Sequence, residues 1–157
     1  VQMMLKKYFQ NQGGVYMLGD SVKEGKFENG KLVSIKTVNH EDTEFVADNF
    51  VLASGSFFSK GIVASQTGVA EPIFGFDIDA DADRGNWFER NMFEAQPYMK
   101  FGVASDEKFR AKKDGQTVEN VYVAGSVLSG FNAIKEGCGA GVSILTALNV
   151  AESIVEN

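Results

Sequence analysis

Val121-Tyr-Val-Ala-Gly-Ser126 is followed by Lys135-Glu-Gly-Cys-Gly-Ala-Gly141 and by a segment with an apolar stripe from Val142 to Val155. The first run has the continuous apolar character of a buried strand, and the last segment has the spacing of a helix. Between them, glycines lead a strand end to a helix N-terminus, where unpaired N–H groups and the positive end of the helix dipole can hold an anion or an electron-rich ring edge. The stretch therefore predicts a strand, a glycine-rich turn and a helix that form a cofactor site.

Three glycines, Gly137, Gly139 and Gly141, lie two residues apart and remove side chains from about one helical turn. Each glycine lowers the stability of the helix by about 1 kcal/mol if it lies inside it. Backbone without side chains at such a cost indicates that a ligand approaches it closely. The simpler alternative is a tight loop that needs positive φ angles. We expect one face of the helix to be apolar, with Ile144, Leu145, Ala147, Leu148, Ala151, Ile154 and Val155, and the other to be polar, with Ser143, Thr146, Asn149, Ser153 and Glu156.

A second buried strand is predicted earlier in the chain, over Phe50 to Ala53, which is uninterrupted apolar sequence. We expect it to be buried on both faces. Because Ser54 and Gly55 follow it, the backbone at its end can approach a ligand closely.

The N-terminal third predicts a helix and then a small antiparallel sheet. A stripe of Val1, Met4, Leu5, Tyr8 and Phe9 indicates a helix that stops at Gly13-Gly14, and a strand is expected over Val15 to Leu18. Asn29-Gly30 separates two strand-like runs, 21–27 and 32–38, and a third run follows at 43–47. These runs predict a three-stranded meander with one exposed face, as the alternation at Val33, Ile35 and Thr37 suggests.

The middle of the chain gives weaker signals. Residues 56–76 are rich in glycine and aromatic residues and are expected to be irregular, with a short helix over 87–93, a strand over 98–104 and a turn over 112–115. Residues 77–83 carry an aspartate at every second position but lack the glycine and the terminal glutamate of a calcium loop. No metal site is therefore expected.

Composition excludes several classes of function. The net charge is −6 and the fifteen Lys and Arg residues are scattered, which disfavours a nucleic-acid partner. One cysteine excludes an internal disulfide framework and fits a reducing compartment, from which we infer a cytoplasmic location. No apolar run approaches the roughly 20 residues of a membrane-spanning helix. The chain begins with Val1 in the middle of a helical pattern, so we expect it to be a fragment of a longer protein.

Isolated reactive residues carry less weight than the glycine-rich turn. Cys138 lies at the proposed helix start, where the dipole lowers a thiol pKa, but no base is near it in sequence, which favours a small space-filling residue. His40 is the only histidine and lies in a predicted turn, so it has no metal cluster to join. The arginines Arg84, Arg90 and Arg110 are expected in surface ion pairs rather than in an anion clamp.

Taken together, three segments resemble a known flavoprotein family. They are Val51-Leu-Ala-Ser-Gly-Ser-Phe-Phe-Ser-Lys-Gly61, Glu71-Pro-Ile-Phe-Gly75, and Val121 to Ser126 with Ile134-Lys-Glu-Gly-Cys-Gly-Ala-Gly-Val142. The chain resembles the B subunit of anaerobic glycerol-3-phosphate dehydrogenase from Gly13 to its C-terminus. The Glu-Gly-Cys-Gly segment is the specific part, while Ala-Ser-Gly after a buried strand is shared with many two-dinucleotide-fold flavoproteins.

The resemblance implies the C-terminal part of a Rossmann-like FAD/NAD(P)-binding α/β fold, as a single partial domain over 1–157 with a meander at about 15–47 and a flavin-facing strand-turn-helix at about 119–157. It implies flavin contacts from Ala53, Ser54, Gly55, Ser56, Gly125, Ser126, Gly137, Cys138, Gly139, Ala140, Gly141 and Val142. A positive helix end there would stabilise the reduced flavin. Ser126 stands where wider relatives carry an acid, which leaves FAD and FMN both open. The catalytic residues remain unknown.

The resemblance also implies two partners, a catalytic flavin subunit and an iron–sulfur subunit that anchors the complex to the membrane, and electron transfer from glycerol 3-phosphate toward quinone. The sequence contains no G-x-G-x-x-G unit, so we expect weak flavin binding or none by this chain alone. Two alternatives are a fragment of a fumarate-reductase-like FAD-dependent oxidoreductase and a non-enzymatic assembly module. The module would dock a partner through the aromatic residues Phe57, Phe58, Phe74, Phe76, Trp87 and Phe88.

Overall fold

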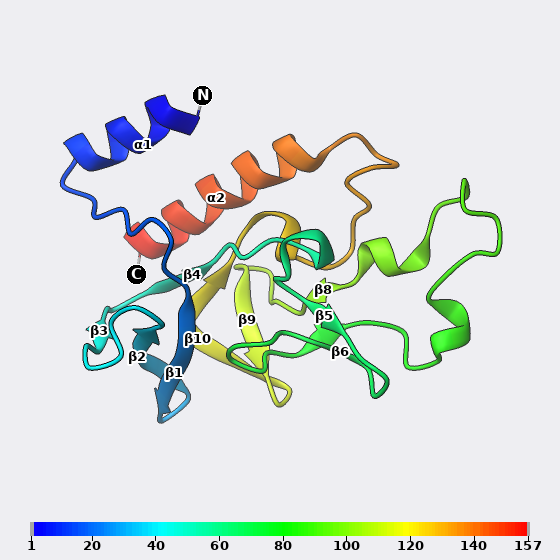
Figure 1. Cartoon of the computed structure of the whole chain (residues 1–157), viewed down its shortest axis with the longest axis horizontal. Helices are drawn as coiled ribbons and strands as arrows, with labels where there is room; N and C mark the ends of the chain where they lie inside the picture. The colour runs from blue at the N-terminus through cyan, green and yellow to red at the C-terminus, as the bar shows by residue number, and fades with distance from the viewer. Residues whose placement is uncertain (1, 157) are drawn as a thin grey trace.

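The computed structural model describes residues 2–156 as a mixed α/β fold with four small sheets and two α-helices (Figure 1). Val1, which belongs to the predicted N-terminal stripe, lies outside the described residues. The elements in chain order are α1 (Gln2–Asn11), β1 (Val22–Glu28), β2 (Lys31–Thr37), β3 (Phe45–Val46), β4 (Phe50–Leu52), η1 (Phe57–Ser59), β5 (Val63–Ala64), β6 (Val69–Ala70), β7 (Ile78–Asp79), η2 (Arg84–Asn86), η3 (Pro97–Lys100), β8 (Gly102–Val103), β9 (Arg110–Lys113), β10 (Gln116–Val123), η4 (Gly125–Val127) and α2 (Gly139–Val155), where η marks a 3-10 helix.

Strand β10 forms the centre of the fold. It pairs with β4 in parallel and with β9 antiparallel, and its residues Val121 and Val123 are almost completely buried. The turn between β9 and β10 is the one predicted at 112–115, with Asp114 and Gly115 both at positive φ. Side chains from β2, β4, β8 and the η4 turn pack around β10 as one apolar core. The two runs that the sequence predicts as strands beside the site are therefore confirmed as strands, and the structure adds that they pair in parallel.

The predicted meander is confirmed as the sheet β1-β2-β3. Asn29 (φ 52°) and Gly30 (φ 77°) form its first turn, which requires positive φ at both residues, as Asn-Gly predicts. Its faces differ from expectation, because Leu32 and Ser34 are buried while Ile35 is only partly covered. The central sheet anchors the backbone of Leu32. The side chain of Asn120 in β10 accepts a hydrogen bond from Leu32 N (3.0 Å) and donates one to Leu32 O (2.7 Å).

Residues 15–18 do not form the predicted strand. Val15 and Leu18 are each more than three-quarters exposed, and no strand lies beside them to pair with. A short apolar run without a pairing partner cannot satisfy its backbone as a strand, and the segment is an irregular connection that ends in a turn at residues 18–19. The preceding helix α1 is confirmed and ends before Gly13, which has φ 89°.

The predicted helix over 87–93 is wrong because side chains take the backbone hydrogen bonds there. Asp83 accepts from Gly85 N and starts the 3-10 helix η2, and Gln96 bonds the backbone at Glu89, Asn91 and Glu94. Bonds to side chains replace the i to i−4 ladder of an α-helix.

The predicted strand over 98–104 is right only at its end. Pro97 begins the 3-10 helix η3, and the strand is β8, which contains Gly102 as expected. A side chain at Gly102 would collide with the backbone of Leu128 and Ser129. Residues 56–76, for which no regular structure is expected, include the short hairpin β5-β6.

Helix α2 begins at Gly139, three residues before the expected start, and packs through an unexpected face. Its buried residues are Thr146 and Val150, whereas Ile144, Leu145 and Leu148 of the predicted apolar face are more than half exposed. The face is set by contact with β10 and η4 rather than by apolar content. Strand β4 also differs from expectation. Val51 is half exposed, so the predicted burial of this strand on both faces is wrong.

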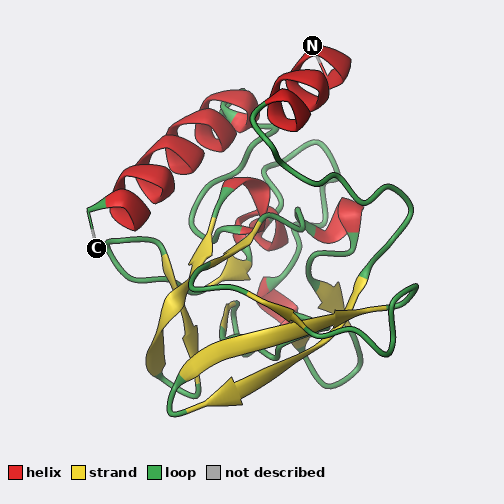
Figure 2. Cartoon of the chain, turned by 90° about the vertical axis from the view of Figure 1, so that its left-hand side faces the viewer, coloured by secondary structure: helices red, strands yellow, loops and turns green. Residues whose placement is uncertain are grey.

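The two α-helices lie on the same side of the strands (Figure 2). Met3, Met4, Leu5 and Tyr8 of α1 are all exposed, and α1 buries none of its described side chains. Between residues 2 and 156, no helix is long and apolar enough to cross a membrane.

Candidate functional site

The site is built where two parallel strands end side by side. Leu52 of β4 is level with Val123 of β10, and Ala124 N donates to Leu52 O (3.0 Å). The segments 53–56 and 124–126 that follow must therefore start at the same edge of the sheet, where ligands of parallel α/β sheets bind. A Cβ added at Gly55 would lie 3.7 Å from Ser126 Oγ, which confirms that the two predicted segments are neighbours.

Close backbone packing holds the first of these segments. Gly55 has φ 84°, and a Cβ there would lie 2.7 Å from Ser59, while a Cβ at Gly61 would collide with Gly55 O. Gly61 N donates to Ser56 O (3.0 Å), which closes the turn through η1. The glycines in Ala-Ser-Gly-Ser-Phe-Phe-Ser-Lys-Gly61 thus form a tight loop, and Lys60 completes it at φ 62°.

The start of α2 reaches the same edge through Gly125. Gly125 N donates to Thr146 Oγ1 (2.9 Å), Thr146 donates to Val142 O (2.6 Å), and a Cβ at Gly125 would lie 3.4 Å from Ser143 Oγ. Gly125 also has φ 74°, so both its conformation and its surroundings favour glycine. The sequence analysis placed Thr146 only on the polar face of the helix and assigned it no role at the site, although it is a hydroxyl residue about two turns inside an apolar helix.

The N-terminus of α2 presents bare backbone. Its N-cap residue is Cys138, whose side chain makes no capping hydrogen bond, and the first turn carries no acidic side chain. Gly141 has open space where a Cβ would stand, while a Cβ at Gly139 would touch Ala133 at 3.4 Å. The free N–H groups of this turn can therefore donate hydrogen bonds to an anion or to the edge of a ring.

The predicted site residues do not line one common cavity. Ser56 and Ser126 share a small cleft of about 110 Å³ with Phe58 and Phe131. Ala53 and Ser54 line a larger cleft of about 530 Å³ beneath the meander, beside Val51 and Phe74. Ser54 Oγ is buried with no hydrogen-bond partner in the described part of the chain. Gly137 and Cys138 line neither cleft.

Other candidates from the sequence have structural roles. Cys138 Sγ donates to Glu136 Oε2 over 3.8 Å, and the histidine that could activate a thiol, His40, is bonded to Asp20 instead. The aspartates at 77, 79 and 83 accept hydrogen bonds from the 114–115 turn, from Ser129 and from Gly85 respectively. Within the described residues, no group of three metal-ligating side chains occurs.

Two of the titratable groups with shifted pKa values lie in structural networks away from this edge. Burial around Asp106 acts to raise its pKa, but hydrogen bonds from Arg110 and Lys108 outweigh this and hold it below the ordinary value. Arg110 thus forms the expected ion pair, at 2.7 Å, whereas Arg84 donates to the carbonyls of residues 65 and 66. The second group is Asp20, which His40 contacts at 2.9 Å in the turn where the histidine was expected.

A family model described as "FAD binding domain" matches residues 1–142, and the chain belongs to this family. The chain is also similar over nearly its whole length to individual proteins that share one name. It is 44% identical to the B subunit of anaerobic glycerol-3-phosphate dehydrogenase from Actinobacillus succinogenes over 98% of the chain and 37% of that protein. It is 44% identical to the same subunit from Yersinia enterocolitica over 96% of the chain and 36% of the relative.

The resemblance drawn from the sequence is thereby confirmed, and the chain spans about 37% of the length of these relatives. No solved structure matches it. The match to an FAD-binding family supports a flavin as the cofactor class.

The residues at the sheet edge fit a flavin in part. The uncapped first turn of α2 gives open backbone at Gly141, whereas Gly55 and Gly125 pack against Ser59 and Ser143. The Ser54 hydroxyl is a buried polar group without a hydrogen-bond partner among the described residues. A phosphate-binding glycine loop is not among the 157 residues. The described residues therefore include bare backbone at the start of α2 but no glycine-rich phosphate loop.

Proposed function

We propose that this chain forms one wall of the flavin site in the B subunit of a glycerol-3-phosphate dehydrogenase. The observation that carries the proposal is the meeting of the ends of β4 and β10 with the start of α2 at Gly125. The supporting comparison is the similarity of almost the whole chain to relatives of that name. FAD is the favoured flavin, because the matching family binds FAD.

The residues proposed to hold the flavin are those of the two strand ends and the helix start. Ala53 to Ser56 and Gly125-Ser126 would lie along the ring, and Gly139, Ala140 and Gly141 would direct their N–H groups toward it. Val142 would adjoin the ring without its N–H, which donates to Cys138 O (2.9 Å). When bound, a flavin supplies hydride and electron transfer, and the protein orients the ring and sets its electrostatic surroundings. In this role the chain belongs to an oxidoreductase that passes electrons from glycerol 3-phosphate toward quinone.

We further propose that the chain works beside a catalytic flavin subunit and an iron–sulfur subunit, in the cytoplasm at the inner face of the membrane. The relatives' names support a multi-subunit enzyme. A role in assembly is a second candidate function, and the exposed apolar faces of α1 and α2 favour it. Of the aromatic residues that the sequence offered as a docking surface for this alternative, Phe57, Phe74 and Phe76 pack in or against the core, whereas Phe58 and Phe88 are more than half exposed.

A flavin titration tests the proposal. The purified 157-residue chain is mixed with FAD or with riboflavin, which carries the same ring without phosphates. We expect weak binding with similar affinity for both ligands, because the phosphate loop is not in this sequence. A stoichiometric yellow complex that survives gel filtration would contradict the proposal that this chain carries only part of the flavin site.

A further inference from the structure

An apolar groove of about 470 Å³ lies between the loop that precedes η3 and the segment that leads into α2. Several of the apolar side chains that line it are open to solvent. Phe58, Met92 and Ile134 are each more than 70% exposed, and Phe93 is 90% exposed. Exposed apolar residues that gather in one place, rather than singly, are typical of a contact surface.

The floor of this groove is attached to the core of the fold. Tyr98 and Met99 of η3 line the groove and are partly buried. The Tyr98 ring packs edge-on against Phe57 (6.0 Å between ring centroids), and Phe57 packs against the apolar core. Tyr98 N also donates to Trp87 O (2.9 Å), which ties η3 to the start of the loop. The groove is therefore a fixed feature of the surface.

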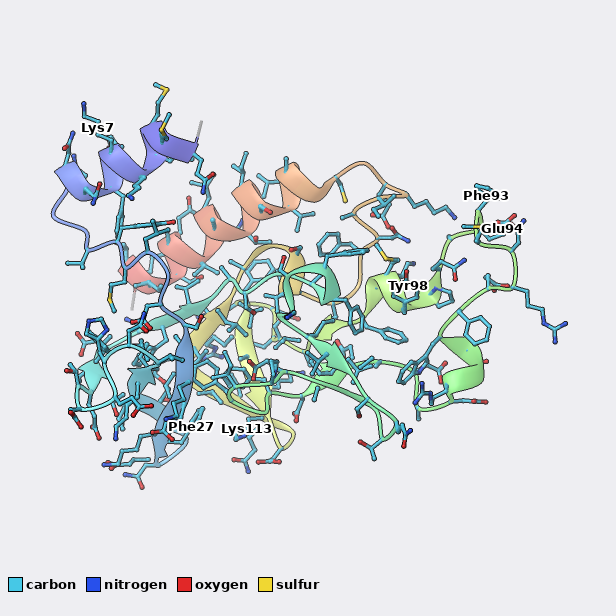
Figure 3. All side chains as sticks on the ribbon, in the orientation of Figure 1. Lys7, Phe27, Phe93, Glu94, Tyr98 and Lys113 are labelled. Atoms are coloured by element: carbon cyan, nitrogen blue, oxygen red, sulfur yellow. The ribbon has the colours of Figure 1, made fainter. Side chains whose placement is uncertain are left out.

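The loop presents Phe93 on a backbone that is held by side chains of the same loop. The Asn91 side chain accepts from Phe93 N (3.1 Å), and Gln96 Nε2 donates to Asn91 O (3.1 Å) and to Glu94 O (3.2 Å). Figure 3 shows Phe93 and Glu94 projecting from the body of the molecule, farther out than Tyr98. A loop that is already ordered loses little conformational freedom on binding, so it can offer the Phe93 ring as an anchor.

The groove carries one charge of each sign. Glu94 comes from the loop, and Lys135 comes from the segment before α2. Neither residue forms an ion pair with another residue between 2 and 156. Two unpaired opposite charges from the two sides of a groove are complementary to the same two charges after a twofold rotation.

We propose that this groove is the contact surface between two copies of this chain related by a twofold axis. Phe93 of each copy enters the groove of the other copy, and Glu94 of each copy faces Lys135 of the other. A twofold contact requires one patch that is complementary to itself, and a projecting ring beside an apolar groove with charges of both signs meets this requirement. Because Phe93 also lines its own groove, the two rings lie close to the axis.

The contact surface adjoins the proposed flavin wall and leaves the two α-helices free. Phe58, Met99 and Ile134 also line the small cleft that contains Ser56 and Ser126. The exposed apolar residues of α1 and α2 line no part of the groove. A second copy at the groove therefore leaves those helix faces available to a different partner.

Sedimentation equilibrium of the purified 157-residue chain over a wide concentration range measures the association. We expect a reversible equilibrium between monomer and dimer, with the weak affinity typical of a small interface. Phe93→Ser should raise the dissociation constant of the dimer about thirtyfold, which is the effect of removing a hot-spot residue. Phe88→Ser is the matched control and should leave it unchanged, because Phe88 is also more than half exposed but does not line the groove.

Two charge reversals test whether the occupant is a second copy. In a dimer of the Glu94→Lys variant two ammonium groups face each other, and in a dimer of the Lys135→Glu variant two carboxylates do. Each variant alone should therefore dimerise at least about tenfold more weakly at low ionic strength. An equimolar mixture of the two variants restores both pairs of opposite charge and should form a heterodimer about as tightly as the wild-type chain, which also shows that both variants are folded.

A wild-type chain that stays monomeric at every concentration would overturn the assignment of a second copy to the groove. Dimers that withstand Phe93→Ser but are lost on Leu148→Ser would place the contact on α2 and overturn the proposed surface. A mixture of the two charge variants that associates no better than either variant alone would overturn the twofold pairing of Glu94 with Lys135.

Discussion

At the scale of single residues, buried polar side chains connect the parts of the fold. Asn120 ties the meander to the central strand, and Thr146 ties α2 to the Gly125 turn. Glu71 is 2% exposed and accepts from the backbone N–H groups of residues 73, 74 and 75, which fixes the turn over the 530 Å³ cleft. Each such group is costly to bury unpaired, so each specifies one arrangement of its neighbours.

Thr146→Val tests the link between α2 and the site. Valine keeps the shape of threonine but leaves the buried Gly125 N–H without an acceptor, which should lower the free energy of unfolding by about 1–3 kcal/mol. Urea denaturation measures this change. Thr146→Ser retains the hydroxyl and serves as the control, with most of the stability kept. Equal losses in the two variants would show that the hydrogen bond to Gly125 is unimportant.

Asp20 makes the meander sensitive to acid. Burial around its carboxyl acts to raise the pKa, but hydrogen bonds from Thr37, Asn39, His40 and Ser21 outweigh this and hold the pKa far below the ordinary 3.8. A carboxylate with a depressed pKa contributes stability that is full above its unfolded value and is lost as pH falls through the folded one. The wild-type chain should therefore exceed Asp20→Asn in stability above about pH 4 and approach it at lower pH.

Denaturant unfolding at a series of pH values measures this difference. Asp42→Asn, an exposed side chain in the same turn region, is the control and should show no comparable loss. A stability difference for Asp20→Asn that grows on acidification would contradict the assigned sign.

At the scale of elements, strand and turn chemistry could be read from the sequence more reliably than helix faces. Three local patterns specify their own structure, and the structure confirms the hairpin turn or strand that each predicts. They are Asn29-Gly30 and the apolar runs that end at Leu52 and Val123. The face of α2 could not be read, because it depends on where η4 and β10 lie and not on which residues are apolar. The helix predicted within residues 87–101 is absent for another reason: backbone groups there bond to a nearby side chain, Gln96, in place of an α-helical ladder.

Val150→Ala and Leu148→Ala compare the two faces of α2. Val150 is 2% exposed, so its truncation should cost about 1–3 kcal/mol of unfolding free energy, while Leu148 is 56% exposed and its truncation should stay within about 0.5 kcal/mol. Thermal or urea unfolding of the 157-residue chain gives both values. A larger loss for Leu148→Ala would mean that the face predicted from the sequence is the packed one.

At the scale of the whole molecule, the chain joins a well-packed core to two uncovered apolar helix faces. The core centres on β10, and the uncovered residues include Met4 and Leu5 of α1 and Leu145 and Leu148 of α2. Exposed apolar surface of this kind is typical of contact with another part of a protein or with a partner.

Only the outline of the candidate site could be predicted from the sequence. Its three segments follow from the order strand, glycine turn and helix, and the parallel pairing of β4 with β10 brings two of them together. The cleft of about 510 Å³ lined by Asn86, Lys100 and Asn132 was not predictable, because these residues come from η2, η3 and the loop before α2, whose packing no local pattern specifies. Loops carry few periodic signals, so their contacts appear only in the folded chain.

Hydrogen exchange of the 157-residue chain, measured by mass spectrometry with and without a large excess of FAD, tests the central claim most directly. The account predicts slower exchange in peptides that cover residues 53–61 and 124–142, and unchanged exchange in the β1-β2 hairpin at 22–37. Gly125→Val, which adds a side chain where Ser143 Oγ would lie 3.4 Å from the new Cβ, should remove that protection. Protection confined to other segments, or no protection at either strand end, would contradict the proposed flavin wall.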